Sequence, residues 1–219
     1  YTHVPSSHLR WDVEPKTLAS AVRSLVDAGW PASFVLMYDE AWHYAAQASA
    51  LVARCSGGNE NCLDALAWLV DPSEGGAGFA PHRDRQPDEA RETFRGSGDA
   101  MYVTAWLPWT DATPDNSCLY VVPAGSDPGY LDGDDPEGAV DPLRAALPSK
   151  EAYQSVRALP AEAGSALLFT HRIIHWGSRG RAGCAEPRIN LSFGCSKDGE
   201  GYEPAYLDRS AFLPFPPVE

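Results

Sequence analysis

Hydrophobic and polar positions divide the chain into a helical first third and a β-rich remainder. Apolar residues at helical spacing predict one helix over residues 16–30, which ends near a glycine and a proline. An alanine-rich stretch predicts a second helix over residues 39–55, closed by two glycines. Residues 61–69 fit either a short helix or a first strand, because a short apolar run does not distinguish the two.

After Asp71 the pattern changes to short apolar runs separated by glycine and proline. The runs expected to be strands cover residues 101–106, 118–123, 155–159, 165–169, 172–175 and 188–193. Short strands with turn signals between them indicate an antiparallel barrel or jelly roll. Residues 125–150 form an acidic segment rich in glycine, proline and aspartate, and we expect a surface insertion there.

The expected fold is therefore mainly β with flanking helices (α+β), a cupin-like double-stranded β-helix. The 219 residues suit a single domain. Within it, a mostly helical part over residues 1–70 is expected to pack on a β-helix core over residues 71–219.

Composition and charge exclude some classes of partner. Apolar residues make up 44% of the chain without a run long enough to span a bilayer, so no membrane span is expected. The formal net charge is −13, and no basic cluster that would bind nucleic acid stands out. Five cysteines without metal-ligand spacing predict free thiols in a reducing compartment, hence a cytoplasmic protein, with Cys55 and Cys62 as a pair that oxidation could join.

Candidate metal chemistry starts at Pro81-His82-Arg83-Asp84. In an extended segment, side chains two residues apart point to the same face, so His82 and Asp84 can converge on one point. One imidazole and one carboxylate supply two of the three ligands of a 2-His-1-carboxylate iron(II) site. The tripeptide alone is weak evidence, because such a pattern also arises by chance.

The far end of the chain supports this interpretation. A glycine turn at Gly164 and an apolar run lead to His175, and Arg188 opens the next apolar run. A guanidinium on a neighbouring strand can grip a carboxylate with two parallel hydrogen bonds, as a dicarboxylate cofactor requires. His171 could share a face with His175, but its spacing to Arg188 makes it the poorer ligand candidate, and we expect a satisfied core or pocket histidine.

Three segments resemble the phytanoyl-CoA dioxygenase-like branch of the iron(II)/2-oxoglutarate oxygenases. They are residues 78–84, GFAPHRD; residues 103–106, VTAW, with residues 114–126, PDNSCLYVVPAGS; and residues 164–175 with Arg188. Two departures stand out. Trp176 interrupts the family's His-Gly-Ser sequence, and Asp127 replaces its histidine after the PGS turn, a position we interpret as structural.

The resemblance implies that His82, Asp84 and His175 bind iron(II), and that Arg188 binds 2-oxoglutarate. Trp106 stands where the family often has a tryptophan that lines the cofactor pocket. Ser178 is a further candidate for contact with 2-oxoglutarate.

Further residues qualify through parity or position alone. Tyr102 and Thr104 share the inward parity of Trp106, so each is a candidate for cofactor contact or for packing. Asn190 and Ser192 share parity with Arg188 and are weaker pocket candidates. Arg83 and Gln86 flank the metal motif, where contact with substrate and simple exposure to solvent are equally expected.

The function implied is an iron(II)- and 2-oxoglutarate-dependent dioxygenase that consumes O2 and releases succinate and CO2. Asp84 favours hydroxylation of an unactivated C–H bond, because the related halogenases lack this carboxylate. The alternatives are a cupin-type metalloenzyme that does not use 2-oxoglutarate, and a non-catalytic β-barrel binding module. A small-molecule substrate is expected, although an acyl group or a protein side chain stays open, as does the oligomeric state.

Overall fold

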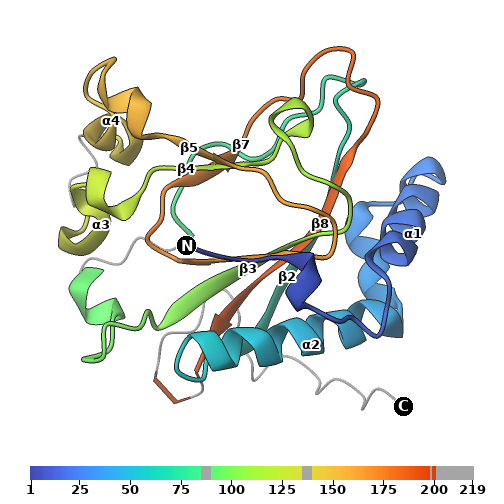
Figure 1. Ribbon diagram of the computed structural model, residues 1–219, viewed down its shortest axis with the longest axis horizontal. Coiled ribbons are helices and arrows are strands. Elements are labelled where there is room, and N and C mark those ends of the chain that lie inside the picture. The colour runs from blue at the N-terminus through green and yellow to red at the C-terminus, as the bar shows by residue number, and fades with distance from the viewer. Residues whose placement is uncertain (85–89, 135–139, 198, 201–219) are drawn as a thin grey trace.

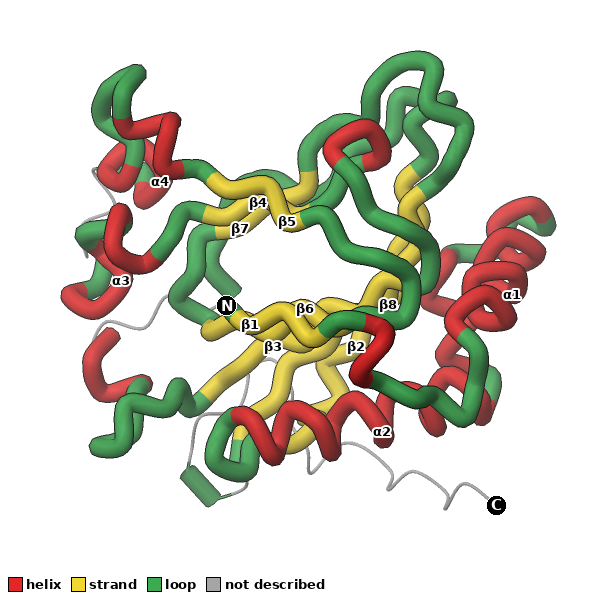
Figure 2. The backbone as a smooth tube through the Cα atoms, viewed as in Figure 1, coloured by secondary structure: helices red, strands yellow, loops and turns green. Residues whose placement is uncertain are grey.

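Two antiparallel sheets form the framework of the computed structural model, which describes residues 1–84, 90–134, 140–197 and 199–200 (Figure 1). The larger sheet has five strands in the order β1 (Thr2–Val4), β6 (Ala166–Thr170), β3 (Tyr102–Pro108), β8 (Arg188–Ser196) and β2 (Glu60–Val70). The smaller sheet has three strands in the order β5 (Arg157–Leu159), β4 (Leu119–Val121) and β7 (His175–Gly177). Figure 2 shows the two sheets lying opposite each other.

Helices cover the outer face of the larger sheet. They are α1 (Pro15–Asp27) and α2 (Asp39–Cys55), and both contribute buried residues to the same hydrophobic cluster as β3, β6 and β8 (Figure 1). Pro15 fits the first turn of α1, where no backbone N–H is needed, and Gly29 follows the helix with a φ of 84°. Two shorter helices, α3 (Gly129–Asp132) and α4 (Pro142–Ala146), lie beside the smaller sheet.

Short 3-10 helices connect these elements. They span Ser6–His8, Ala32–Met37, Ala90–Thr93, Pro114–Asn116, Ala124–Ser126 and Ala152–Ser155. No helix in the described residues is long and apolar enough to cross a bilayer.

Strict alternation along β3 and β8 separates the helix-facing core from the inside of the sandwich. Val103, Ala105 and Leu107 pack with the helices, whereas Trp106 belongs to a second buried cluster that joins the two sheets. On β8 the residues from Ile189 onward at odd positions face the helices, so Arg188 faces inward with Trp106. The alternation therefore sends polar and charged side chains of both strands toward the interior between the sheets.

Several sequence expectations need correction. Residues 61–69 lie within strand β2, which pairs with β8 on both sides of a register shift between Asn61 and Ala65, so tertiary pairing decided between the two open alternatives, helix and strand. Strand β1 was not foreseen, and with β2 it means that the first 70 residues are not only helical: they contribute two strands to the larger sheet.

Two further expectations fail after residue 125. The run 172–175 does not begin a strand until His175, because the chain turns at Thr170, whose carbonyl accepts a hydrogen bond from the Ile173 N–H. The segment 125–150 is more than a surface insertion, since it contains α3 and α4 and buries Asp127.

Candidate metal centre

An irregular segment beside β7 carries the first part of the site. The His82 N–H donates to the His175 carbonyl at 3.0 Å, and the His175 N–H donates back to the His82 carbonyl at 3.0 Å. Gly177 N–H likewise bonds to the Phe79 carbonyl at 3.1 Å. Residues that are distant in sequence are therefore held opposite each other as a bridged antiparallel pair.

Three potential ligand atoms converge at this bridge. His82, Asp84 and His175 each offer one atom, and these atoms all lie within 4.8 Å of one another. The Asp84 Oδ1 atom lies 3.4 Å from His82 Nε2 and 3.5 Å from His175 Nε2. Two imidazoles and one carboxylate on one side of a point leave its other side open, which is the arrangement of a facial triad.

Hydrogen bonds behind the triad orient its ligands. His82 Nδ1 donates to the Ala80 carbonyl at 2.8 Å, and His175 Nδ1 donates to the Ile173 carbonyl at 3.1 Å. Each ring thereby points Nε2 toward the common point, where a metal ion can take the place of an Nε2 proton. The second carboxylate oxygen of Asp84 accepts a hydrogen bond from the Thr104 hydroxyl.

The protonation states of two ligands suit a cation. Burial, only partly opposed by Asp84, lowers the pKa of His175, so its imidazole is neutral at neutral pH. Burial by itself would raise the pKa of Asp84, but the neighbouring His175 and hydrogen bonds from His82 and Thr104 lower it below the ordinary value. A neutral imidazole and an ionised carboxylate are the forms that bind metal.

Arg188 lies buried beside Trp106, on the face of the larger sheet that points toward the smaller one. Its side chain is fully buried, and one Nη atom donates to the Asn190 side-chain oxygen. Its Nε and other Nη atoms have no hydrogen-bond partner among the residues that the structure describes. The guanidinium carbon lies 5.6 Å from the centre of the Trp106 ring, whose Nε1 is likewise buried without a described partner.

A buried guanidinium with free donors is costly unless an anion pairs with it. Gly177 lies close to this guanidinium and against the Gly78 backbone, since a Cβ there would lie 2.9 Å from Gly78 Cα, 3.1 Å from Ser117 Oγ and 3.4 Å from Arg188 Nη2. Gly177 also follows His175 by two residues on the same face of β7, which is roughly 6.6 Å along a strand. A five-carbon dicarboxylate spans such a distance, so the residues fit 2-oxoglutarate between the triad and Arg188.

A small cleft opens beside the triad. Its volume is about 230 Å³, and besides His82 and Asp84 it is lined by Asp64, Leu66, Tyr102, Thr104, Ser192, Phe193 and Gly194. Tyr102 lies over Gly194 and donates a hydrogen bond to Asp64 at 3.1 Å. None of the residues that line this cleft is among the described contacts of Arg188, which are Asn190 and Trp106.

Comparison with known proteins adds to this geometry. The family model of phytanoyl-CoA dioxygenase (PhyH) matches residues 11–185, which is more than half of the chain. The chain belongs to the phytanoyl-CoA dioxygenase family. This membership confirms the resemblance drawn from the sequence motifs and, with it, the iron, 2-oxoglutarate and O2 chemistry expected of the chain.

Solved structures show the same fold at low sequence identity. The epimerase SnoN in complex with Fe3+, alpha ketoglutarate and nogalamycin RO has 20% identity and a TM-score of 0.64, over 97% of this chain and 85% of that one. The carbocyclase SnoK from nogalamycin biosynthesis has 16% identity and a TM-score of 0.55, over 90% and 79% of the two chains. The non-heme monooxygenase ThoJ has 14% identity and a TM-score of 0.56, over 89% and 71%. No curated protein sequence matches this member of the family.

Most of the residues proposed from the sequence lie together. The Arg188 guanidinium lies over the Trp106 ring, and the Thr104 hydroxyl donates a hydrogen bond to the Asp84 carboxylate. Tyr102 lines the cleft beside the triad and does not join the described contacts of Arg188. Asn190 touches Arg188 directly, which its strand parity had suggested.

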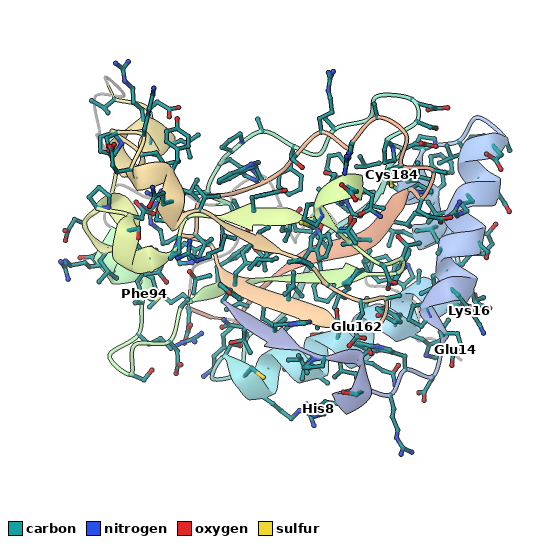
Figure 3. The ribbon with its side chains drawn as sticks, turned by 45° about the horizontal axis from the view of Figure 1, so that its top comes forward. His8, Glu14, Lys16, Phe94, Glu162 and Cys184 are labelled. Atoms are coloured by element: carbon teal, nitrogen blue, oxygen red, sulfur yellow. The ribbon has the colours of Figure 1, made fainter. Side chains whose placement is uncertain are left out.

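Two other candidate residues, His171 and Ser178, lie apart from the triad and Arg188. His171 is buried outside the triad, where Nδ1 and Nε2 lie 2.9 Å from the Tyr102 carbonyl and 2.8 Å from the Thr93 hydroxyl. Its ring packs on Phe94, which Figure 3 labels at the end of the molecule opposite Cys184. Ser178 hydrogen-bonds to Tyr120, whose ring stacks on Trp176, so its contact with 2-oxoglutarate stays a prediction without geometric support.

Sequence reasoning missed Ser117 and misjudged Arg83. Ser117 is fully buried with an unpartnered hydroxyl and has a positive φ of 73°, which turns it toward Gly177. It lies inside the quoted PDNSCL motif, so the signal was present but no residue of that motif was weighed individually. Arg83 is neither exposed nor in the cleft: its side chain is 1% exposed and bound by carboxylates. Gln86 lies outside the described residues.

The cysteines agree with the expectation of free thiols as far as they are described. Cys55, Cys118, Cys184 and Cys195 form no disulfide in the described part of the chain. The Cys62 side chain lies outside the described part of the structure, so its pairing with Cys55 under oxidation stays a prediction.

Proposed function

We propose that this protein is an iron(II)- and 2-oxoglutarate-dependent oxygenase that hydroxylates an unactivated C–H bond of a small organic molecule. The observation that carries the proposal is the presence, beside the His82, Asp84 and His175 ligand atoms, of a buried Arg188 guanidinium whose Nε and Nη2 have no partner among the described residues. A metal site alone would serve many reactions, whereas a metal site with a fixed carboxylate receptor beside it serves a keto acid. The two facing sheets then form a jelly-roll domain, and the whole chain is one domain.

In this proposal each residue has a defined task. His82, Asp84 and His175 hold the metal and leave one side of it open. Arg188 holds the distal carboxylate of 2-oxoglutarate, and Trp106 covers the guanidinium and keeps water from it. When bound, the metal and 2-oxoglutarate supply the O2 chemistry that releases succinate and CO2.

The cleft beside the triad is the proposed substrate site. Its volume of about 230 Å³ suits a small molecule or the reacting end of a larger one. Its described lining contains the carboxylates of Asp64 and Asp84 and the apolar side chain of Leu66, which is 47% exposed. A lining of this kind favours a neutral or cationic substrate over a strongly anionic one such as a coenzyme A thioester.

Hydroxylation is proposed because Asp84 is present as the third ligand, which leaves no extra position for a halide. The neighbours of the same fold include an epimerase and a carbocyclase, so product mass separates the possible outcomes. A hydroxylated product gains one oxygen atom, a cyclised product loses two hydrogen atoms, and an epimer keeps its mass. The family chemistry also favours this class over a cupin-type enzyme without 2-oxoglutarate and over a non-catalytic binding module.

The first experiment is an anaerobic titration of the metal-free protein with iron(II) and 2-oxoglutarate, followed by its weak visible charge-transfer band. We expect the band in wild type, its loss in His82→Ala, and a need for far more 2-oxoglutarate in Arg188→Ala. Iron binding without a band in wild type would favour a cupin-type enzyme that does not use 2-oxoglutarate. Absence of iron binding would favour a non-catalytic binding module. A cytoplasmic location stays a prediction that rests on the free thiols.

A further inference from the structure

The residue between the two ligands of the metal motif takes part in a buried group of charges. Alternation along the extended segment sends Arg83 to the face opposite His82 and Asp84. There its side chain is 1% exposed, although an arginine at the surface of a loop is normally solvated. A buried guanidinium requires partners that satisfy its donors, and the structure supplies them from two distant segments.

Two carboxylates hold Arg83 like a clamp. Its Nη atoms donate to Asp127 at 2.6 and 2.9 Å in a bidentate pair, and its Nε donates to Asp134 at 2.8 Å. The Asp127 side chain is 1% exposed and the Asp134 side chain 15%. Burial would lower the pKa of Arg83, but its hydrogen bonds and charge pairing with Asp127 and Asp134 raise it, so Arg83 stays charged.

Arg172 completes the group. Its Nη2 atom lies 3.3 Å from Asp134 and donates to the Gly129 carbonyl at 2.7 Å. Arg83 in turn donates to the backbone carbonyl of Arg172, three residues before His175. We call Arg83, Asp127, Asp134 and Arg172 the Arg83 charge cluster. Its two positive and two negative charges balance, and such a buried group is favourable only when all pairs are made together.

The Arg83 charge cluster joins three parts of the chain. One is the segment that carries His82 and Asp84, the second is the turn that leads to His175, and the third is the segment 127–134, which includes α3. Asp127 also accepts the Gly129 N–H at 3.1 Å, so the same carboxylate that binds Arg83 shapes the start of α3. The backbone on both sides of the triad is thereby fixed by charges that never touch the metal.

We propose that Arg83 is a positioning residue that sets the direction of His82 and Asp84, and that metal binding is thermodynamically linked to the ordering of residues 127–134. The inference rests on the proposed metal site. Linkage is reciprocal: if the ordered segment strengthens metal binding, then metal strengthens the order of the segment. A cluster that merely stabilised the fold would raise the melting temperature and leave metal affinity unchanged.

Hydrogen exchange of the wild-type protein tests the linkage directly. The probe is Co(II), added without 2-oxoglutarate under anaerobic conditions. The Tyr130 and Gly133 amides, which bond to the Asp127 and Gly129 carbonyls, are expected to exchange more slowly with Co(II) by about fivefold or more, the lower end of typical coupling. Unchanged exchange in protein that demonstrably binds Co(II) would overturn the proposal. Failure of wild type to bind Co(II) would instead overturn the proposed function.

Variants test the positioning role. Arg83→Lys keeps the charge but cannot fork Asp127 while it reaches Asp134, and Asp127→Asn removes one charge at nearly constant shape. In both, Co(II) binding is expected to weaken by about tenfold or more, with a changed visible Co(II) spectrum, as when a residue that supports metal ligands is altered. If Arg83→Lys does not fold, Asp127→Asn alone tests the positioning role.

The matched control is Arg95→Lys. Arg95 is also partly buried, with a side chain 14% exposed that binds Glu200 at 2.6 Å, but none of its described partners belongs to the triad. It is expected to lower the melting temperature and leave Co(II) affinity and spectrum unchanged. If Arg83→Lys and Asp127→Asn behave like Arg95→Lys, with Co(II) affinity and spectrum as in wild type, the cluster only stabilises the fold and the proposal is wrong.

Discussion

Replacement of Arg188 by methionine is expected to leave the free protein nearly as stable as wild type while it removes 2-oxoglutarate binding. Burial lowers the pKa of Arg188 well below its ordinary value, to about 10. At about 1.4 kcal/mol per pKa unit, the charged form is disfavoured by about 3 kcal/mol in the folded protein without an anion. This unfavourable contribution is present at neutral pH and is relieved only as pH rises through the lowered pKa.

Methionine removes that unfavourable contribution but also removes two favourable contacts. The hydrogen bond from Arg188 to Asn190 contributes about 1.5–3 kcal/mol and the contact with the Trp106 ring about 0.5–2 kcal/mol. These values nearly cancel, so the free energy of unfolding of the metal-free protein should change by no more than about 2 kcal/mol. Truncation of an ordinary buried side chain of this size is expected to be clearly destabilising, at about 2–5 kcal/mol.

The affinity for 2-oxoglutarate should respond very differently. Loss of a buried partner of a carboxylate is expected to cost about 3–5 kcal/mol, which is about a hundredfold to several thousandfold in Kd. The affinity of Arg188→Lys for 2-oxoglutarate should lie between those of wild type and Arg188→Met, because an ammonium keeps the charge and loses the bidentate geometry. Arg157→Met, at an exposed arginine on β5, is the control that should change neither quantity.

Urea unfolding of the metal-free proteins and calorimetric titration of 2-oxoglutarate into the Co(II)-loaded proteins measure the two quantities. A saturating excess of about 100 Kd should stabilise wild type by about 2.7 kcal/mol and leave Arg188→Met unaffected. The reasoning is refuted if Arg188→Met loses more than about 3 kcal/mol of stability yet binds 2-oxoglutarate almost as wild type does. Arg188 would then be a structural residue.

Three further changes test the surroundings of the site. Thr104→Val removes the hydroxyl that donates to Asp84 and so raises the pKa of that carboxyl. Metal binding is lost as pH falls through this pKa, because the carboxylate becomes protonated. Titration of Co(II) at a series of pH values should therefore show the loss of binding at higher pH than in wild type. Gly177→Ala places a Cβ 2.9 Å from Gly78 Cα and 3.4 Å from Arg188 Nη2, so the backbone beside the site must shift. It should weaken 2-oxoglutarate binding by about tenfold in calorimetry, whereas Gly125→Ala, with nothing within 4 Å, should not. Ser178→Ala should leave the Kd for 2-oxoglutarate unchanged, since its hydroxyl bonds to Tyr120; a large loss would restore the original prediction for this residue.

The sequence by itself determined the chemistry and most of the elements. Period-two spacing in His82-Arg83-Asp84 is a local property of extended backbone, so it predicted that the two ligands share a face without knowledge of the fold. The same alternation along residues 101–106 and 188–193 predicted which side chains of β3 and β8 point inward. Family motifs then supplied His175 and Arg188, which no local rule connects to His82.

Only the tertiary structure decided which strands pair and where each strand begins. Residues 61–69 became β2 because β8 offers paired partners for most of them, and β7 begins at His175 because the chain first turns after Thr170. A shift of one residue changes the face on which a side chain lies, so the start of β7 decides what Ser178 contacts, and it contacts Tyr120.

Long-range charge pairing was likewise beyond the sequence. Arg83 was expected at substrate or in solvent, because its neighbours in the chain give no sign of Asp127 or Asp134, which are brought to it across 44 and 51 positions. Burial of a charge depends on all its partners arriving at once, and that is a property of the folded chain alone. Local spacing thus fixed which residues can bind a metal, and tertiary packing decided which distant residues hold them in place.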